Sequence, residues 1–252
     1  MKKGFSLVEL SVVLVILGLL TGGILAGQSL IRAATLRSVT SDMNRWKTAT
    51  QSFRDKYNML PGDMINAVNY WGQAAHCPGT AAQPSTDTST CNGDGNWQIT
   101  STGTSYENFR YWQQLANAGL IEGSFTGVTG SAGTDNAVPG QNVPQSRISS
   151  AGYMVEYLGN LSGSAYWVDG AYGHQMRMGL QGTGWTNAPA LKPEEMWNID
   201  TKMDDGMPLN GVIYSEKASG QANCATTDLP ATAVYAVNTT GLSCTLFFKT
   251  GF

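Results

Sequence analysis

Charged side chains are scarce in this sequence, and dense basic clusters are absent. Asp, Glu, Lys and Arg make up 13% of the 252 residues, about half the share found in average soluble domains. The formal net charge is −3 at pH 7. Proteins that bind nucleic acid present clustered Lys and Arg to its phosphates. The composition therefore argues against nucleic acid as a partner.

Histidine is also scarce, and the common catalytic motifs are missing. The two histidines, His76 and His174, lie far apart in the chain. There is no Gly-x-Ser-x-Gly, Walker or His-Glu-x-x-His pattern. His76 neighbours Cys77, which we expect in a disulfide, and His174 falls in an expected strand as a half-buried structural residue. We therefore expect that the protein is not an enzyme. The alternative, an anchored enzyme, would need a clustered polar site in the fold.

The chain has only four cysteines, and none follows the Cys-x-x-Cys spacing of a metal site. Four cysteines allow three disulfide connectivities. We favour Cys77 with Cys91 and Cys224 with Cys244, because each pair brackets a separate segment rich in Gly, Ser and Thr. Lys2 and Lys3 are expected to keep the N-terminus cytoplasmic, so this part of the chain would face an oxidising compartment, in which the four cysteines can pair.

The sequence does contain one long apolar run at its N-terminus. Two lysines precede Gly4, and from Phe5 to Ala26 the only charge is Glu9. The run just reaches the ~20 residues that a membrane-spanning helix needs. A carboxylate in such a run costs ~2.5 kcal/mol or more, so Glu9 should have a partner. If a peptidase cuts after Gly4, the new amine of Phe5 lies one helical turn from Glu9, on the same chain or on a neighbour.

The segment Gly4-Phe5-Ser6-Leu7-Val8-Glu9 resembles the cleavage and methylation signal of type IV prepilins and type II secretion pseudopilins. The resemblance implies that a prepilin peptidase cuts between Gly4 and Phe5 and methylates the new amine. It also implies that Glu9 pairs with this amine on a neighbouring subunit during assembly. The alternatives are an uncleaved anchor and an ordinary signal peptide cut near Ala26. The anchor does not explain Glu9, and the apolar run is long for a signal peptide.

The resemblance further implies a location and a set of partners. Lys2 and Lys3 keep the N-terminus cytoplasmic by the positive-inside rule. The chain would cross the bacterial inner membrane once, with its C-terminal domain in the periplasm. Its partners would be prepilin peptidase, an inner-membrane assembly platform, and further copies of itself or other pilins.

We therefore expect a structural subunit of a type IV pilus or of a type II secretion pseudopilus, polymerised through its N-terminal helix. The alternative is a minor or tip pilin that binds a surface or a glycan. That alternative predicts a patch of exposed Tyr and Trp on the loops 77–91 or 123–140.

Hydrophobic periodicity predicts an α+β fold. Apolar residues recur every three or four positions as far as Tyr57, as on one side of a helix, and the Pro and Gly of residues 58–63 end it. The stripe comprises Leu36, Val39, Met43, Trp46, Thr50, Phe53 and Tyr57. Short helices are expected over residues 64–73 and 106–118 and from Lys192. An antiparallel sheet is expected from segments 152–158, 164–168, 174–180, 212–214, 233–237 and 244–248.

These patterns divide the chain into five parts. They are a prepilin leader (1–4), a transmembrane and assembly half of the helix (5–27), an amphipathic half (28–57), a variable loop-rich segment (58–150) and an antiparallel sheet region (151–252). The sheet would cover the apolar side of the long helix. Pilins share this arrangement.

Residues 92–98 are the first candidate for a calcium loop. Oxygen-bearing side chains alternate at Asn92, Asp94, Asn96 and Gln98, as at the start of such a loop. The position of its bidentate glutamate, however, falls on Gly103. The alternative is a glycine-rich turn.

Asp200, Asp204 and Asp205 are the second candidate, because three carboxylates suit a hard cation such as Ca²⁺. The alternative is a helix end in which Asp200 pairs with Lys202 or Lys192. The resemblance requires no cofactor, so calcium would be an addition to the fold.

Overall fold

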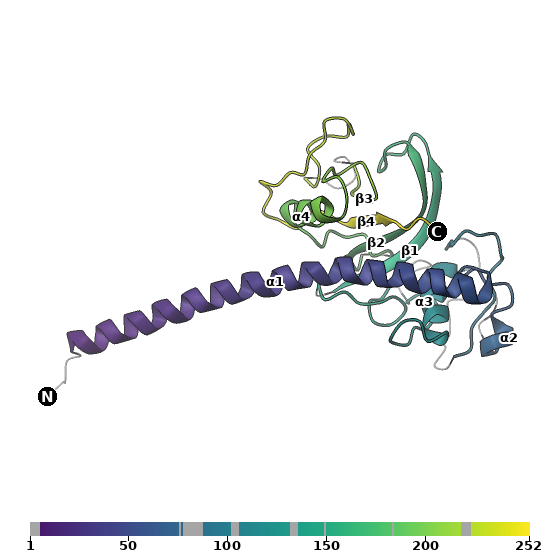
Figure 1. Cartoon of the computed structure of the whole chain (residues 1–252), viewed down its shortest axis with the longest axis horizontal. Helices are drawn as coiled ribbons and strands as arrows, with labels where there is room; N and C mark the ends of the chain where they lie inside the picture. Colours follow the sequence, from purple (N-terminus) through teal and green to yellow (C-terminus); the bar gives the residue numbers. More distant parts are fainter. Residues whose placement is uncertain are drawn as a thin grey trace. The chain divides into compact units, whose positions relative to one another are not determined.

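The computed structural model describes residues 6–75, 77, 88–101, 106–131, 136–148, 150–182, 184–217 and 223–252. The chain divides into two compact units, Met1–Ser38 and Val39–Phe252. Helix α1 (Leu7–Tyr57) runs through both units (Figure 1). The other elements belong to the second unit: α2 (Val68–Trp71), α3 (Glu107–Asn117), β1 (Ala151–Leu161), β2 (Gly170–Leu180), α4 (Pro193–Met203), β3 (Ile213–Tyr214) and β4 (Leu246–Lys249).

Helix α1 is continuous over 51 residues, which at 1.5 Å per residue is about 75 Å. In its second half one side is buried, and the buried residues are Val39, Met43, Trp46, Ala49, Thr50 and Phe53. The helix ends at Tyr57 because Asn58 adopts a φ of +54°, the left-handed conformation that commonly terminates helices. The predicted helix end is confirmed, and so is the predicted stripe from Val39 to Phe53, whereas Leu36 and Tyr57 are only half-buried.

The buried side of α1 packs on aromatic side chains of α3 and β1. The ring centroid of Trp46 lies 4.2 Å from that of Tyr153 and 5.1 Å from that of Trp112, edge-on in both cases. Thr50 Oγ1 and the hydroxyl of Tyr111 share a buried hydrogen bond of 2.5 Å. Edge-on ring pairs contribute about 0.5–1.5 kcal/mol beyond the area they bury, so these contacts fix the helix in the core of the second unit.

The four strands form one antiparallel sheet in the order β1-β2-β4-β3 (Figure 1). Strands β1 and β2 are a long hairpin in which Met154 pairs with Arg177. Strand β4 lies between its neighbours, and Phe248 pairs with Met176 of β2 and with Ile213 of β3. The predicted α+β fold, a long helix on an antiparallel sheet, is confirmed.

The loop-rich segment between α1 and the sheet is organised by α3, which is buried from Glu107 to Leu115 although most of its residues there are polar or charged. Gln114 Oε1 accepts a 2.7 Å hydrogen bond from the backbone N–H of Gly62. Gly62 has a φ of +88°, and a Cβ there would collide with the carbonyl oxygen of Glu107. Only glycine permits this approach of the loop to the helix.

Two predicted strands are wrong. Residues 164–168 form bends in the β1–β2 connection, where Trp167 packs its ring on Phe247 instead of entering the sheet. Residues 233–237 make a single bridge, between Tyr235 and Ala225. The helix predicted over residues 64–73 is limited to α2. The apolar and aromatic composition of the two segments predicted burial in a sheet. Their side chains instead pack from loops, and their backbones do not form regular strand pairs.

Candidate functional site

The first part of α1 exposes a continuous apolar surface. Leu7 is 86% exposed and Ile31 is 69% exposed, and most large apolar side chains between them are more than half exposed. Within the described residues, α1 is the one helix long and apolar enough to cross a membrane, and its most apolar window has a mean hydropathy of 2.4. A helix that is apolar all round belongs in lipid or among other helices.

Glu9 is the only charged residue between Ser6 and Ile31. Its Oε2 accepts a 2.8 Å hydrogen bond from the backbone N–H of Ser6, and Ser6 Oγ accepts one of 3.3 Å from the N–H of Val8. These bonds satisfy N–H groups that the first turn of a helix leaves without partners. A negative charge at this end is also favoured by the helix dipole. Gly4 and Phe5, the predicted cleavage and methylation site, lie outside the described residues.

A first acidic cluster joins three separate parts of the chain. Asp63, Asp94 and Glu107 each place a carboxylate oxygen within 4.8 Å of the others. Asp63 accepts hydrogen bonds from the backbone N–H groups of Gly95 at 2.7 Å and Trp97 at 2.8 Å. The Asp63 carboxylate therefore holds the loop that precedes α3.

Burial controls the protonation of this first cluster. It raises the pKa of Asp63 to about 6 and that of Glu107 to about 7, although hydrogen bonds from backbone N–H groups oppose both shifts. Glu107 accepts such bonds from Asp94 and Thr100, each at 3.1 Å. Three carboxylates at this spacing offer the oxygen ligands that a hard cation prefers, but most of their described hydrogen bonds already serve the loop.

The asparagines of the first predicted calcium loop bond to the backbone. Asn92 Oδ1 accepts a hydrogen bond of 3.0 Å from the N–H of Val68. Asn96 Oδ1 accepts one of 2.7 Å from the N–H of Gln98, and its amide group donates to Asp94 Oδ2 at 2.8 Å. Asp94 is thus the one predicted ligand among the three carboxylates of the first cluster.

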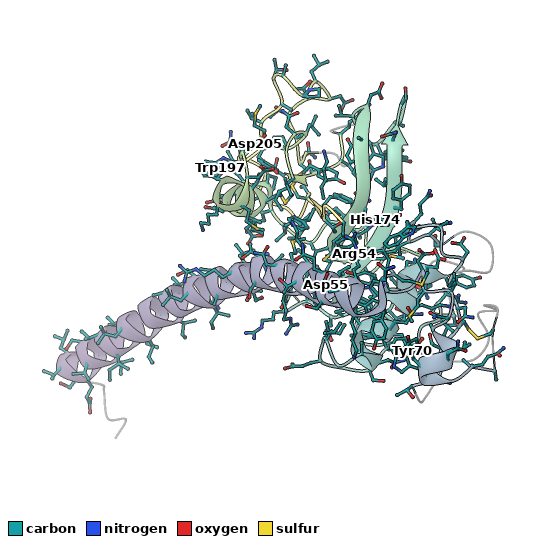
Figure 2. All side chains as sticks on the ribbon, turned by 45° about the vertical axis from the view of Figure 1, so that its right-hand side comes forward. Arg54, Asp55, Tyr70, His174, Trp197 and Asp205 are labelled. Atoms are coloured by element: carbon teal, nitrogen blue, oxygen red, sulfur yellow. A yellow bond between two sulfur atoms is a disulfide. The ribbon has the colours of Figure 1, made fainter. Side chains whose placement is uncertain are left out.

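The second predicted set, at the C-terminal end of α4, does come together. Asp200, Asp204 and Asp205 place carboxylate oxygens within 4.8 Å of one another, and Figure 2 shows Asp205 near Trp197 at this helix. Asp200 Oδ2 accepts a 2.7 Å hydrogen bond from the hydroxyl of Tyr235.

Burial, reinforced by Asp205 and Asp204, raises the pKa of Asp200 to about 7. The C-terminal end of a helix adds further negative potential. A cation bound here would offset this accumulation of negative charge.

Residues 1–25 match the model of a family described as the prokaryotic N-terminal methylation motif. The chain carries a prepilin-type signal. Such a signal marks type IV pilins and pseudopilins, so the resemblance seen from Gly4 to Glu9 is confirmed. The prepilin-type signal and the apolar first half of α1 together fit membrane anchoring. No curated protein and no solved structure matches the chain.

Both predicted disulfides are present in the part of the chain that follows the prepilin-type signal. Cys77 bonds to Cys91 and Cys224 to Cys244, with Cα–Cα distances of 5.4 and 5.1 Å. The second disulfide ties the loop after β3 to the residues that lead into β4. Disulfides of this kind persist in oxidising compartments.

His174 has a structural role in β2 (Figure 2). Its Nε2 accepts a 3.1 Å hydrogen bond from the backbone N–H of Ile99, so Nδ1 carries the proton and donates to the carbonyl of Phe252 at 2.9 Å. Burial lowers the pKa of His174. Both ring nitrogens are therefore engaged in fixing the chain. His76 lies outside the described residues.

Proposed function

We propose that the chain is a structural subunit of a type IV pilus or of a type II secretion pseudopilus. One observation carries the proposal: the methylation motif of residues 1–25 includes the first turns of α1, whose apolar side chains are exposed as far as Ile31. Such a surface requires lipid before assembly and the helices of other subunits after it. The membrane supplies the first environment, and polymerisation through α1 supplies the second.

In this proposal prepilin peptidase cuts between Gly4 and Phe5 and methylates the amine of Phe5. The amine carries a positive charge that a neighbouring subunit presents to Glu9. Burying the Glu9 carboxylate in an apolar bundle is costly unless an opposite charge accompanies it. Pairing therefore favours the one axial register in which amine and carboxylate meet.

The same proposal places the chain once through the bacterial inner membrane. Lys2 and Lys3 hold the N-terminus in the cytoplasm, and the domain with the two disulfides lies in the periplasm. The partners are prepilin peptidase, an inner-membrane assembly platform, and further copies of the chain or other pilins.

Intact mass and N-terminal sequence of the chain, purified from its native membrane, test the proposal. A chain that begins with N-methylated Phe5 supports it, and the unprocessed mass should reappear in cells that lack the peptidase. The variant Gly4→Leu should also keep its unprocessed mass, because the bulky side chain blocks the cut. A mature chain that begins after Ala26, or one identical with and without the peptidase, would overturn the proposal.

A second candidate function, surface binding by a minor or tip pilin, is favoured by exposed aromatic side chains. Tyr70 and Tyr166 are each 56% exposed, and Trp97 and Trp197 are nearly half exposed. The expectation that the patch lies on loops 77–91 or 123–140 is wrong, because neither contains Tyr or Trp. Tyr166, on the β1–β2 connection, borders a cavity of about 710 Å³, and Trp197 and Trp97 border smaller ones.

A further inference from the structure

A cavity of about 710 Å³ opens between the β1–β2 hairpin and the loops that follow β2 and β3. We call it the Glu216 cavity. Six of its lining residues are charged or aromatic: Glu156, Tyr166, Trp167, Arg177, Trp185 and Glu216. All of them belong to the second unit of the chain. Ligand sites in proteins are concavities of this size in which a few polar groups converge among apolar and aromatic side chains.

Three charged groups converge on the Glu216 cavity. Arg177 forms an ion pair with Glu156, and Glu156 Oε1 also accepts a 2.6 Å hydrogen bond from the side-chain amide of Gln175. Glu216 is only 8% exposed; burial raises its pKa to about 6, and the charge of Arg177 opposes this shift. With all three ionised, the charges sum to −1. The cavity therefore offers charged acceptors and a guanidinium donor without a surplus of positive charge.

The aromatic rings at the cavity are held in place by the fold. The ring of Trp167 stands edge-on to Phe247 at a centroid distance of 4.6 Å. The guanidinium carbon of Arg177 lies over the ring of Trp185, 4.5 Å from its centroid, so the two side chains hold each other in place. Tyr166 lies at the mouth, 56% exposed. Rigid rings of this kind provide contact area at low entropic cost.

Lys217 fixes the position of the loop that carries Tyr166. Its backbone N–H donates to the carbonyl of Tyr166 at 2.8 Å, and its ammonium group donates to the carbonyl of Ser164 at 2.8 Å. Because Lys217 follows Glu216 directly, the same two-residue segment supplies a carboxylate and positions an aromatic ring. The arrangement is therefore built before any ligand arrives.

We propose that the Glu216 cavity binds an uncharged saccharide unit. Sugar hydroxyls donate to carboxylates and accept from a guanidinium, and the C–H faces of a pyranose pack on aromatic rings. Hydrogen bonds with an ionised partner are roughly twice as strong as neutral ones. An acidic sugar would meet two carboxylates against one guanidinium, so a neutral sugar is preferred. A purely apolar ligand would form no hydrogen bond with any of the three charged groups.

This proposal rests on the second candidate function, surface binding, for which it names the ligand class, and it does not depend on polymerisation. Its test uses the full chain in a polyoxyethylene detergent, which avoids the sugar head groups of alkyl glycosides. The probes are the methyl β-glycosides of glucose, galactose and their N-acetylamino forms, with 3′-sialyllactose as the acidic comparison. Saturation-transfer NMR and tryptophan fluorescence report binding, because Trp167 and Trp185 line the cavity.

We expect at least one neutral glycoside to bind with a Kd of about 1 mM or tighter. Glu216→Gln, which preserves shape but removes the charge, should weaken binding about tenfold, and Tyr166→Ala should weaken it similarly. Tyr70→Ala is the matched control, because Tyr70 has the same exposure and does not line the cavity; it should bind as the unmodified chain does.

Three results would overturn the proposal: no binding of any neutral probe, tighter binding of 3′-sialyllactose than of the neutral probes, or equal binding by Glu216→Gln, Tyr166→Ala and the unmodified chain. Melting curves of each variant show whether a loss of binding reflects unfolding. Because the test uses unpolymerised protein, its failure leaves the filament assignment in place, and failure of the mass experiment leaves the cavity in place.

Discussion

The ring of Trp46 lies edge-on to the ring of Tyr153 at a centroid distance of 4.2 Å, which joins α1 to the first strand of the sheet. The two residues are far apart in sequence, and both are almost fully buried. The second half of α1 is therefore part of the globular core, whereas the first half leaves its apolar side chains exposed.

Trp46→Ala should sharply destabilise the globular unit. Truncating a fully buried tryptophan typically lowers the free energy of unfolding by about 3–5 kcal/mol. The substitution also removes the ring contacts with Tyr153 and Trp112. Urea denaturation of the full chain in detergent, followed by near-ultraviolet circular dichroism, measures the loss. Gln51→Ala on the exposed side of α1 is the control. Equal midpoints for the two variants would contradict the packing argument.

The sequence could predict the elements whose evidence is local. The α1 stripe has a clear helical period, and the N-terminal signal is a contiguous motif, so both were predictable. The disulfides were also predictable, because each cysteine pair brackets its own loop. Aromatic residues misled the strand assignment at residues 164–168, since Trp167 packs on Phe247 from a loop.

The first acidic cluster shows why part of the candidate site was missed. Asp63, Asp94 and Glu107 lie on separate segments, and no spacing relates them. The only available signal was the acidic residue at the start of α3, which sequence alone assigns to the helix dipole. By contrast, Asp200, Asp204 and Asp205 share one helix end, so sequence order already placed them together.

The full chain, held in a chelator, should become more stable as the pH falls from about 8 to about 5. The folded pKa of Asp200 is raised to about 7 by burial, well above its value of about 3.9 in unfolded chains. The contribution of Asp200 to the free energy of unfolding is therefore complete below the unfolded pKa and is lost as the pH rises through about 7. Asp63, Glu107 and Glu216 shift in the same direction.

Because burial lowers the pKa of His174, this residue acts in the opposite sense. Its contribution to the free energy of unfolding is lost as the pH falls below about 6.5, the ordinary pKa of histidine in an unfolded chain. The Tm measured across this range gives the net effect. Asp200→Asn should flatten the profile, since the neutral amide has no charge to desolvate. A profile as steep as that of the unmodified chain would show that Asp200 does not control it.

Calcium should raise the Tm of the full chain through the cluster at the end of α4. We propose this cluster as the calcium site because three carboxylates meet at the negative end of a helix, and a bound cation stabilises the folded state by mass action. Calorimetry with Ca²⁺, with Mg²⁺ and with EDTA measures the shift. Asp205→Asn should remove it, and Asp94→Asn should preserve it. The reverse pattern would assign calcium to the first cluster, and no shift in the unmodified chain would remove both candidates.

Glu9→Leu should leave membrane insertion intact and impair filament assembly. Insertion becomes easier, because the substitution removes a carboxylate that costs ~2.5 kcal/mol or more in an apolar segment. Assembly loses the charge that we propose to pair with the methylated amine of Phe5, and with it the preference for one axial register.

Glu9 also accepts a hydrogen bond from the N–H of Ser6, so Glu9→Gln, which retains an acceptor oxygen, separates helix capping from charge pairing. Membrane fractionation measures insertion, and the recovery of sheared filaments measures assembly. Ser11→Ala in the same exposed stretch is the control and should assemble normally. If both Glu9 variants fail to assemble, the carboxylate charge is what sets the register. If Glu9→Gln assembles as well as the control and only Glu9→Leu fails, the charge is not required, and the capping bond to Ser6 is.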